Sequence, residues 1–119
     1  MEFVFSETSE MYETELEGII FEFEEKPEEN IETQLQSIAD NYHKNIEHII
    51  EHILPDLEEL YGDVNKEEVE EKLGTPYIDI DVQTITYLEQ EFDDDAMHIF
   101  MLEYMDDTFE ELGDFSIDG

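Results

Sequence analysis

The chain has 119 residues, enough for one domain, and carries 37 acidic residues against four lysines and no arginine, a net charge of −33. This charge excludes direct binding to nucleic acid or to an anionic membrane, because both carry the same sign. A hydrophobic content of 39% with 12% aromatic residues differs from that of disordered acidic tails and predicts one folded domain over residues 1–119. The absence of cysteine and of long apolar runs excludes disulfides and predicts a cytoplasmic protein.

The first part of the chain predicts strands. Residues 1–5 alternate in polarity and can form a short strand, whereas residues 6–17 are polar and acidic and predict a loop or an irregular edge segment. Residues 18–24 place large apolar side chains on one face and Glu22 and Glu24 on the other, which is the pattern of a half-buried strand.

A long amphipathic helix follows. The apolar residues of segment 31–53 recur at spacings of three and four, which predicts one helix of about seven turns. Pro55 either kinks this helix or opens a new turn, because it lacks a backbone donor and restricts the residue before it. Gly62 is suited to end the helix.

The second half begins with a short helix that Asn65 caps and Gly74 ends. The period then changes to two, which predicts four strands in segments 77–82, 83–91, 97–105 and 108–117. Segment 97–105 is apolar on both faces, which is typical of a central strand. The order of these elements predicts an α+β fold, with an antiparallel sheet of about four to six strands and one long and one short helix packed on one face.

One short motif resembles a metal site. His48-Ile49-Ile50-Glu51-His52 matches H-x-x-E-H, in which two histidines one helical turn apart hold zinc and the glutamate acts as general base. In the predicted helix, however, Glu51 lies on the side opposite the apolar stripe, and His48 also lies well outside that stripe. We therefore interpret both histidines as solvent-facing and predict no metal site, and a zinc-dependent hydrolase that uses His48, Glu51 and His52 is the alternative function.

Other catalytic and cofactor patterns are missing. The sequence has no glycine-rich phosphate loop, no G-x-S-x-G motif and no Cys/His pair. Asp79-x-Asp81 and Asp93-Asp94-Asp95 are fragments of cation sites, but neither belongs to an EF-hand loop. We expect no cofactor and no enzymatic activity.

The net charge predicts the partner. A charge of −33 imposes self-repulsion on a free-standing domain, and a basic partner relieves it. We expect a binding protein that neutralises a basic protein, either a nuclease toxin, a restriction enzyme or a DNA-binding protein. The acidic contact candidates are Glu28, Glu29, Glu32, Glu47 and Glu51 along the predicted helix and Asp93, Asp94 and Asp95 at a predicted turn. The aromatic candidates are Phe92, Phe100 and Tyr104, with a place in the core as the alternative for each.

Two alternatives concern the surface as a whole. An uncovered apolar face of the sheet could make a homodimer, whose association would strengthen with salt because two chains of net charge −33 repel each other. The acidity could also be incidental to the function of an uncharacterised domain.

Two groups of proteins resemble this chain. Phage anti-restriction and DNA-mimic proteins are similarly small, rich in Glu and Asp and free of cysteine. The composition, the α+β layout and the closing segment Phe115-Ser116-Ile117-Asp118-Gly119 resemble small acidic proteins of Gram-positive bacteria, some of which are predicted toxin-immunity factors. The resemblance lies in the general layout, so it implies an inhibitor of a nuclease or nucleic-acid-binding protein but no particular site residues.

Overall fold

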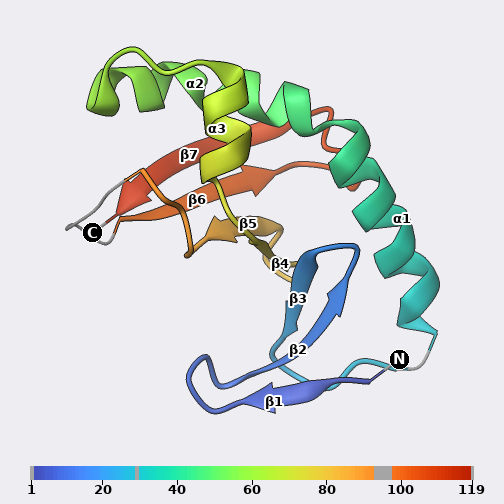
Figure 1. The fold of residues 1–119 in the computed structure, drawn as a ribbon. Helices are drawn as coiled ribbons and strands as arrows, with labels where there is room; N and C mark the ends of the chain where they lie inside the picture. Colours follow the sequence, from blue (N-terminus) through green and yellow to red (C-terminus); the bar gives the residue numbers. More distant parts are fainter. Residues whose placement is uncertain (1, 29, 93–97, 119) are drawn as a thin grey trace.

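The computed structural model describes residues 2–28, 30–92 and 98–118 and shows an α+β fold, in which helices cover one face of a single sheet (Figure 1). The strands are β1 (Val4–Ser6), β2 (Met11–Leu16), β3 (Ile19–Phe23), β4 (Pro76–Asp79), β5 (Thr84–Tyr87), β6 (Ile99–Tyr104) and β7 (Leu112–Asp118). The helices are α1 (Ile31–Lys44), α2 (Ile46–Tyr61) and α3 (Lys66–Lys72). Within the described ranges, none of these helices has the length and hydrophobicity that crossing a membrane requires.

The seven strands of the sheet lie side by side in the order of the sequence, from β1 to β7. All neighbours are antiparallel except β3 and β4, which are parallel. The three helices connect these two strands and return the chain to the end of the sheet where β3 began, which forces the parallel pairing. The predicted antiparallel sheet of four to six strands is therefore wrong in its strand number and at this one pair.

The prediction of a loop or an irregular edge segment over residues 6–17 is also wrong, because this segment contains β2, which is paired with a strand on each side. Its alternate positions hold Tyr12, Thr14 and Leu16, so only one of the three is aliphatic, and the acidic residues around them give the segment the composition of a loop. A two-residue turn joins β2 to β3, with φ values of 56° at Glu17 and 78° at Gly18. Positive φ at both positions matches the right-handed twist of a tight hairpin.

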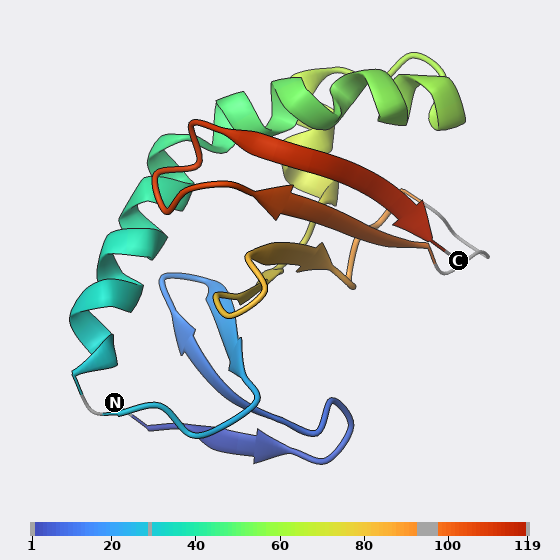
Figure 2. The same ribbon diagram turned by 180° about the vertical axis from the view of Figure 1, so that it is seen from behind.

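The predicted long helix is two helices, α1 and α2, which meet at Asn45 (Figure 1). The Asn45 side-chain amide donates to the carbonyl oxygens of Asn41 at 3.0 Å and Thr108 at 2.9 Å. The Asn41 amide in turn donates to the carbonyl of Asp107 at 3.1 Å. The two asparagines thus fasten the β6–β7 connection to the junction of the helices, and α2 continues above β7 (Figure 2).

The predicted end of the long helix at Gly62 and the predicted cap of the short helix at Asn65 are confirmed. Pro55 lies on the exposed side of α2, which continues to Tyr61 and ends at Gly62 with a φ of 83°. Asn65 caps α3, because its side-chain oxygen accepts the backbone N–H of Glu68 at 2.8 Å.

The core lies between the helices and one face of the sheet. Strand β6 shows how the two faces differ, because Phe100 and Tyr104 are 0% and 1% exposed whereas Ile99 and Met101 are 37% and 38% exposed. Phe100 and Tyr104 are therefore wrong as partner-binding residues, since the helices cover their side of the sheet. The apolar residues of β6 lie on both faces as predicted, but only one face is covered.

Candidate partner-binding surface

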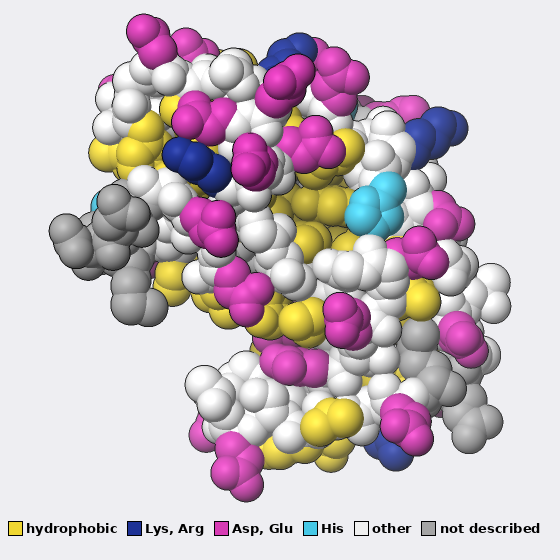
Figure 3. Space-filling model, in the orientation of Figure 1, with side chains coloured by type: hydrophobic (Ala, Val, Ile, Leu, Met, Phe, Trp, Pro, Cys, Tyr) yellow, Lys and Arg dark blue, Asp and Glu magenta, His cyan; other side chains and the backbone are white. Residues whose placement is uncertain are grey.

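The acidic charge extends over the whole molecule. The 33 net charges share a surface of 7391 Å², or about 224 Å² for each charge. Figure 3 shows carboxylate side chains from the helices down to β1, with few lysines among them. Two of the four lysines are occupied within the helical layer: Lys66 pairs with Glu51 and Glu47, and Lys72 pairs with Glu68 at 3.2 Å.

The structure does not bring the predicted acidic helix residues together. Glu47 and Glu51 lie on α2, where Lys66 compensates their charge, and its hydrogen bond and charge lower the pKa of the Glu51 carboxyl. Glu32 lies in the first turn of α1, at the far end of the two helices, and Glu28 precedes it. Glu29, Asp93, Asp94 and Asp95 lie outside the described residues.

Phe92 lies at the margin of the core. It is partly buried, its ring stacks on Tyr61 with a centroid distance of 5.2 Å, and the Lys72 Nζ atom lies 5.5 Å from its centroid. A second ring contact, to Phe100 at 5.8 Å, connects it to the buried aromatic residues. These contacts give Phe92 a structural role in this structure.

The histidines of the H-x-x-E-H motif connect the helix to the sheet. The Nε2 atoms of His48 and His52 lie 2.9 Å and 2.8 Å from the carbonyl oxygens of Glu110 and Gly113. Because a carbonyl only accepts, each Nε2 carries a proton and donates it, which leaves Nδ1 as the ring nitrogen that could bind a metal ion. In the described part of the chain, no three His, Asp or Glu side chains gather to hold a metal ion.

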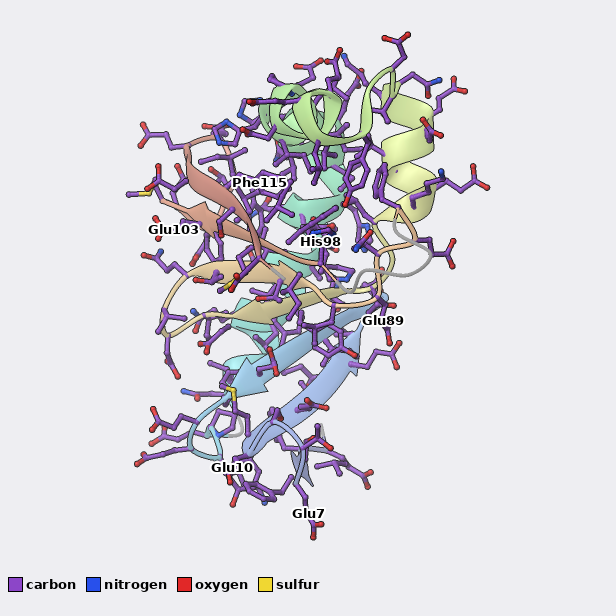
Figure 4. All side chains as sticks on the ribbon, turned by 90° about the vertical axis from the view of Figure 1, so that its left-hand side faces the viewer. Glu7, Glu10, Glu89, His98, Glu103 and Phe115 are labelled. Carbon is purple, nitrogen blue, oxygen red and sulfur yellow. The ribbon has the colours of Figure 1, made fainter. Side chains whose placement is uncertain are left out.

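The face of the sheet opposite the helices carries a line of five paired polar residues, four of them acidic, which we name the acidic row. Its members are directly paired across five strands from β2 to β6: Glu13, Glu22, Asp79, Thr84 and Glu103. Figure 4 looks onto this face with α1 behind the sheet, Glu103 at one side and Glu89 at the other. The described strands contain no lysine, arginine or histidine, so nothing basic lies among these carboxylates.

Three neighbours in the acidic row differ from most carboxylates of the protein. Only five of the acidic residues that the structure describes are partly buried, and Glu13, Glu22 and Asp79 are three of them. Partial burial, followed by the charges of Glu13 and Asp79, raises the pKa of the Glu22 carboxyl. Like charges directly opposite each other destabilise a sheet.

Two members of the acidic row, Glu13 and Asp79, accept hydrogen bonds from nearby residues. Ser9 donates a hydrogen bond to Glu13 at 3.3 Å, and the backbone N–H groups of Asp81 and Val82 approach the Asp79 carboxylate at 3.0 and 3.4 Å. A groove of about 330 Å³ opens beside Asp79, between the β1–β2 and β4–β5 turns. Glu10, Glu24, Asp79 and Asp81 contribute four carboxylates to its lining.

At β7 the acidic row meets a glycine. A bulge in β7 places two residues, Gly113 and Asp114, opposite Glu103. A Cβ atom on Gly113 would lie only 3.1 Å from the Glu103 Cβ and 3.2 Å from its Oε2 and from the Met105 sulfur. The glycine therefore leaves space in which the Glu103 side chain lies against the sheet.

A second line of paired residues runs beside the acidic row, and we name it the apolar row. It consists of Ile20, Tyr77, Thr86 and Met101 on β3 to β6, with Glu15 and Ser116 at its ends. Burial, followed by the charges of Glu89, Glu13 and Glu22, raises the pKa of the Tyr77 phenol, so the field of the acidic row reaches this side chain.

Sequence reasoning placed the contacts on the helix and missed both rows. The signal was present, because the outward positions of segments 18–24 and 77–82 hold Glu22 and Asp79. What brings them side by side is the parallel pairing of β3 and β4, which no local pattern predicts. Comparisons with protein-family models, curated proteins and solved structures found no match, so the interpretation of this surface depends on its own geometry.

Proposed function

We propose that the protein is an acidic binding protein that neutralises a basic protein partner by covering its active or nucleic-acid-binding surface. One observation carries the proposal. The chain has 37 acidic residues and only four lysines, and the three lysine–glutamate ion pairs among the described residues all lie in the helical layer. The sheet face is left with partly buried carboxylates that have no basic neighbour among the described residues, and a cationic partner would supply the missing charge.

Binding explains the chemistry of the surface better than catalysis does. His48 and His52 use their Nε2 atoms to bond carbonyls of the sheet layer. Among the described residues, no three His, Asp or Glu side chains gather to hold the zinc ion that the hydrolase alternative requires. The described strands place no histidine, lysine or arginine beside the carboxylates of the acidic row to act as a base partner or to bind an anionic substrate. A surface of this kind attracts cations from a distance and speeds association, because its field adds over many charges.

Competition with DNA tests the proposal. The protein is immobilised and used to capture proteins from its native host, first at low salt and then at about 0.15 M salt, where the Debye length is ~8 Å. We expect a basic nucleic-acid-binding protein that remains bound at about 0.15 M and is released by duplex DNA. Retention only at low salt indicates unspecific capture of polycations. A retained partner that still binds DNA while complexed would refute the proposed mode of inhibition.

A further inference from the structure

We propose that the docking site is the uncovered face of the sheet, and that its occupant is a protein surface that presents lysine or arginine side chains beside a parallel apolar ridge. This inference rests on the proposed function and adds the face and the chemistry of the partner. The two rows define that chemistry. Neighbouring strands lie about 4.8 Å apart, and the rows are two residues apart along each strand, or about 7 Å.

The acidic row is the part of the surface that most needs a cation. Glu13, Glu22 and Asp79 are partly buried, directly opposed and without an ion pair among the described residues. On α2, by contrast, Lys66 already compensates Glu47 and Glu51. A cation from a partner therefore gains more at the sheet than at the helices, since it relieves existing repulsion there instead of replacing an internal lysine.

The apolar row shows that charge alone does not describe the site. Tyr77 and Ile20 are partly buried members of the row, and Met101, another member, exposes 38% of its surface. Ile99, two residues before Met101 on β6, exposes 37%. Tyrosine and methionine are enriched in protein interfaces, where an apolar centre inside a polar rim supplies most of the affinity. A purely cationic ligand would leave this row exposed, whereas a protein surface with an adjacent apolar ridge would cover it.

Charge decides between the possible occupants of the face. A second copy of the chain would place Glu13, Glu22 and Asp79 against the same residues of a molecule that also carries a net charge of −33. Nucleic acid is excluded for the same reason. A basic protein complements the acidic row and can cover the apolar row at the same time.

The test uses two polymers as probes, poly-L-lysine and a random lysine–tyrosine copolymer, with binding measured by calorimetry at about 0.15 M salt. The test variant combines Glu13→Gln, Glu22→Gln and Asp79→Asn, which keeps the size of each side chain and raises the net charge by three. We expect this variant to bind the copolymer at least tenfold more weakly than the natural chain does.

The matched control variant combines Asp56→Asn, Glu58→Gln and Glu59→Gln on the exposed side of α2, and it changes the net charge by the same amount. We expect it to bind within about threefold of the natural chain, because only the long-range field changes. A further variant, Met101→Ser, should reduce the preference for the copolymer over poly-L-lysine while it leaves poly-L-lysine binding unchanged. Circular dichroism confirms that each variant is folded.

Each outcome decides a part of the inference. Equal weakening by the two triple variants would overturn the assignment to the sheet face and leave the proposed function standing. No preference for the copolymer, or a preference that Met101→Ser does not reduce, would overturn the apolar ridge. A natural chain that binds neither polymer at this salt concentration would overturn both this inference and the proposed function.

Discussion

Replacing Glu22 by glutamine is expected to stabilise the fold at neutral pH. The Glu22 carboxyl is partly buried and lies directly between Glu13 and Asp79, and burial followed by these two charges raises its pKa. Because the folded state binds this proton more tightly than the unfolded state does, stability falls as the pH rises from the ordinary pKa of 4.5 through the raised value. Glutamine removes this loss and keeps the shape of the side chain.

The magnitude follows from the two opposed pairs. A like-charge pair directly across two strands costs roughly 0.2–1 kcal/mol, so the pairs with Glu13 and Asp79 together cost about 0.4–2 kcal/mol. An unfolding entropy of about 2.1 cal/mol/K per residue gives roughly 0.25 kcal/mol/K for a chain of this length. Glu22→Gln should therefore raise the melting temperature at pH 7 by about 4 °C, the value for a gain of ~1 kcal/mol.

Thermal unfolding followed by circular dichroism at pH 7 and near pH 3.5 measures this effect. Glu15→Gln is the matched control, because Glu15 is exposed on the same strand as Glu13 and is paired with Ile20 instead of with a carboxylate. We expect a clearly smaller gain for the control at pH 7, and no gain from Glu22→Gln at the acidic pH, where the carboxyl is protonated in both states. An equal gain from both variants, or one that persists at low pH, would refute the reasoning.

Four further predictions concern the core tyrosines, the histidines and the total charge. The Tyr42 and Tyr87 hydroxyls share a buried hydrogen bond of 2.7 Å, so Tyr87→Phe should cost about 1–2 kcal/mol in denaturant unfolding, and replacing both tyrosines should cost less than the sum of the single changes. Tyr104→Phe should be neutral or stabilising, because the Tyr104 hydroxyl is buried without a hydrogen-bond partner in the described part of the chain; a loss as large as that of Tyr87→Phe would contradict this. His48→Ala and His52→Ala should each destabilise the fold by about 0.5–1.5 kcal/mol through loss of a bond to the sheet layer, and added zinc should leave the melting temperature unchanged, whereas a stoichiometric zinc-dependent rise would favour the hydrolase. Sodium chloride should raise the melting temperature between about 0.01 and 1 M, since the Debye length falls from ~30 to ~3 Å, and a flat response would show that self-repulsion contributes little.

Elements that depend on neighbouring residues were predictable from the sequence. The strand around Phe21 has strict alternation, and its large side chains are buried as expected. Asn65 and Gly62 act within one helical turn, through a side-chain cap and a positive φ, so their roles could be inferred from local chemistry. The α+β class follows from the order of such elements.

The remaining features depend on residues far apart in the chain. Asn45 divides the predicted long helix, and one of its two side-chain hydrogen bonds is made to Thr108, 63 residues later. The helical periodicity continues across the junction, so periodicity alone favours a single helix. Strand β2 was missed for a related reason, because its pairing with β3 stabilises a segment whose composition is typical of a loop.

The candidate site shows the same division. A run of glutamates on a predicted helix is visible in the sequence, and it directed the prediction to Glu47 and Glu51, which Lys66 compensates in the structure. The acidic row exists only because the registers of five strands place its members side by side. The sequence pattern identifies single outward-facing residues such as Glu22, but it does not show that they lie next to one another across neighbouring strands.

The repulsion within the acidic row lowers the stability of the free protein, and under the proposed function the same repulsion favours binding of a cationic partner. A fold optimised only for stability would not keep Glu22 between two other carboxylates, because glutamine fits the same position without the repulsion. If a cationic partner neutralises the row, the repulsion in the free protein becomes part of the favourable free energy of binding. Glu22→Gln should then stabilise the free protein and weaken the complex, the opposed effects expected of a residue retained for its function at the expense of stability.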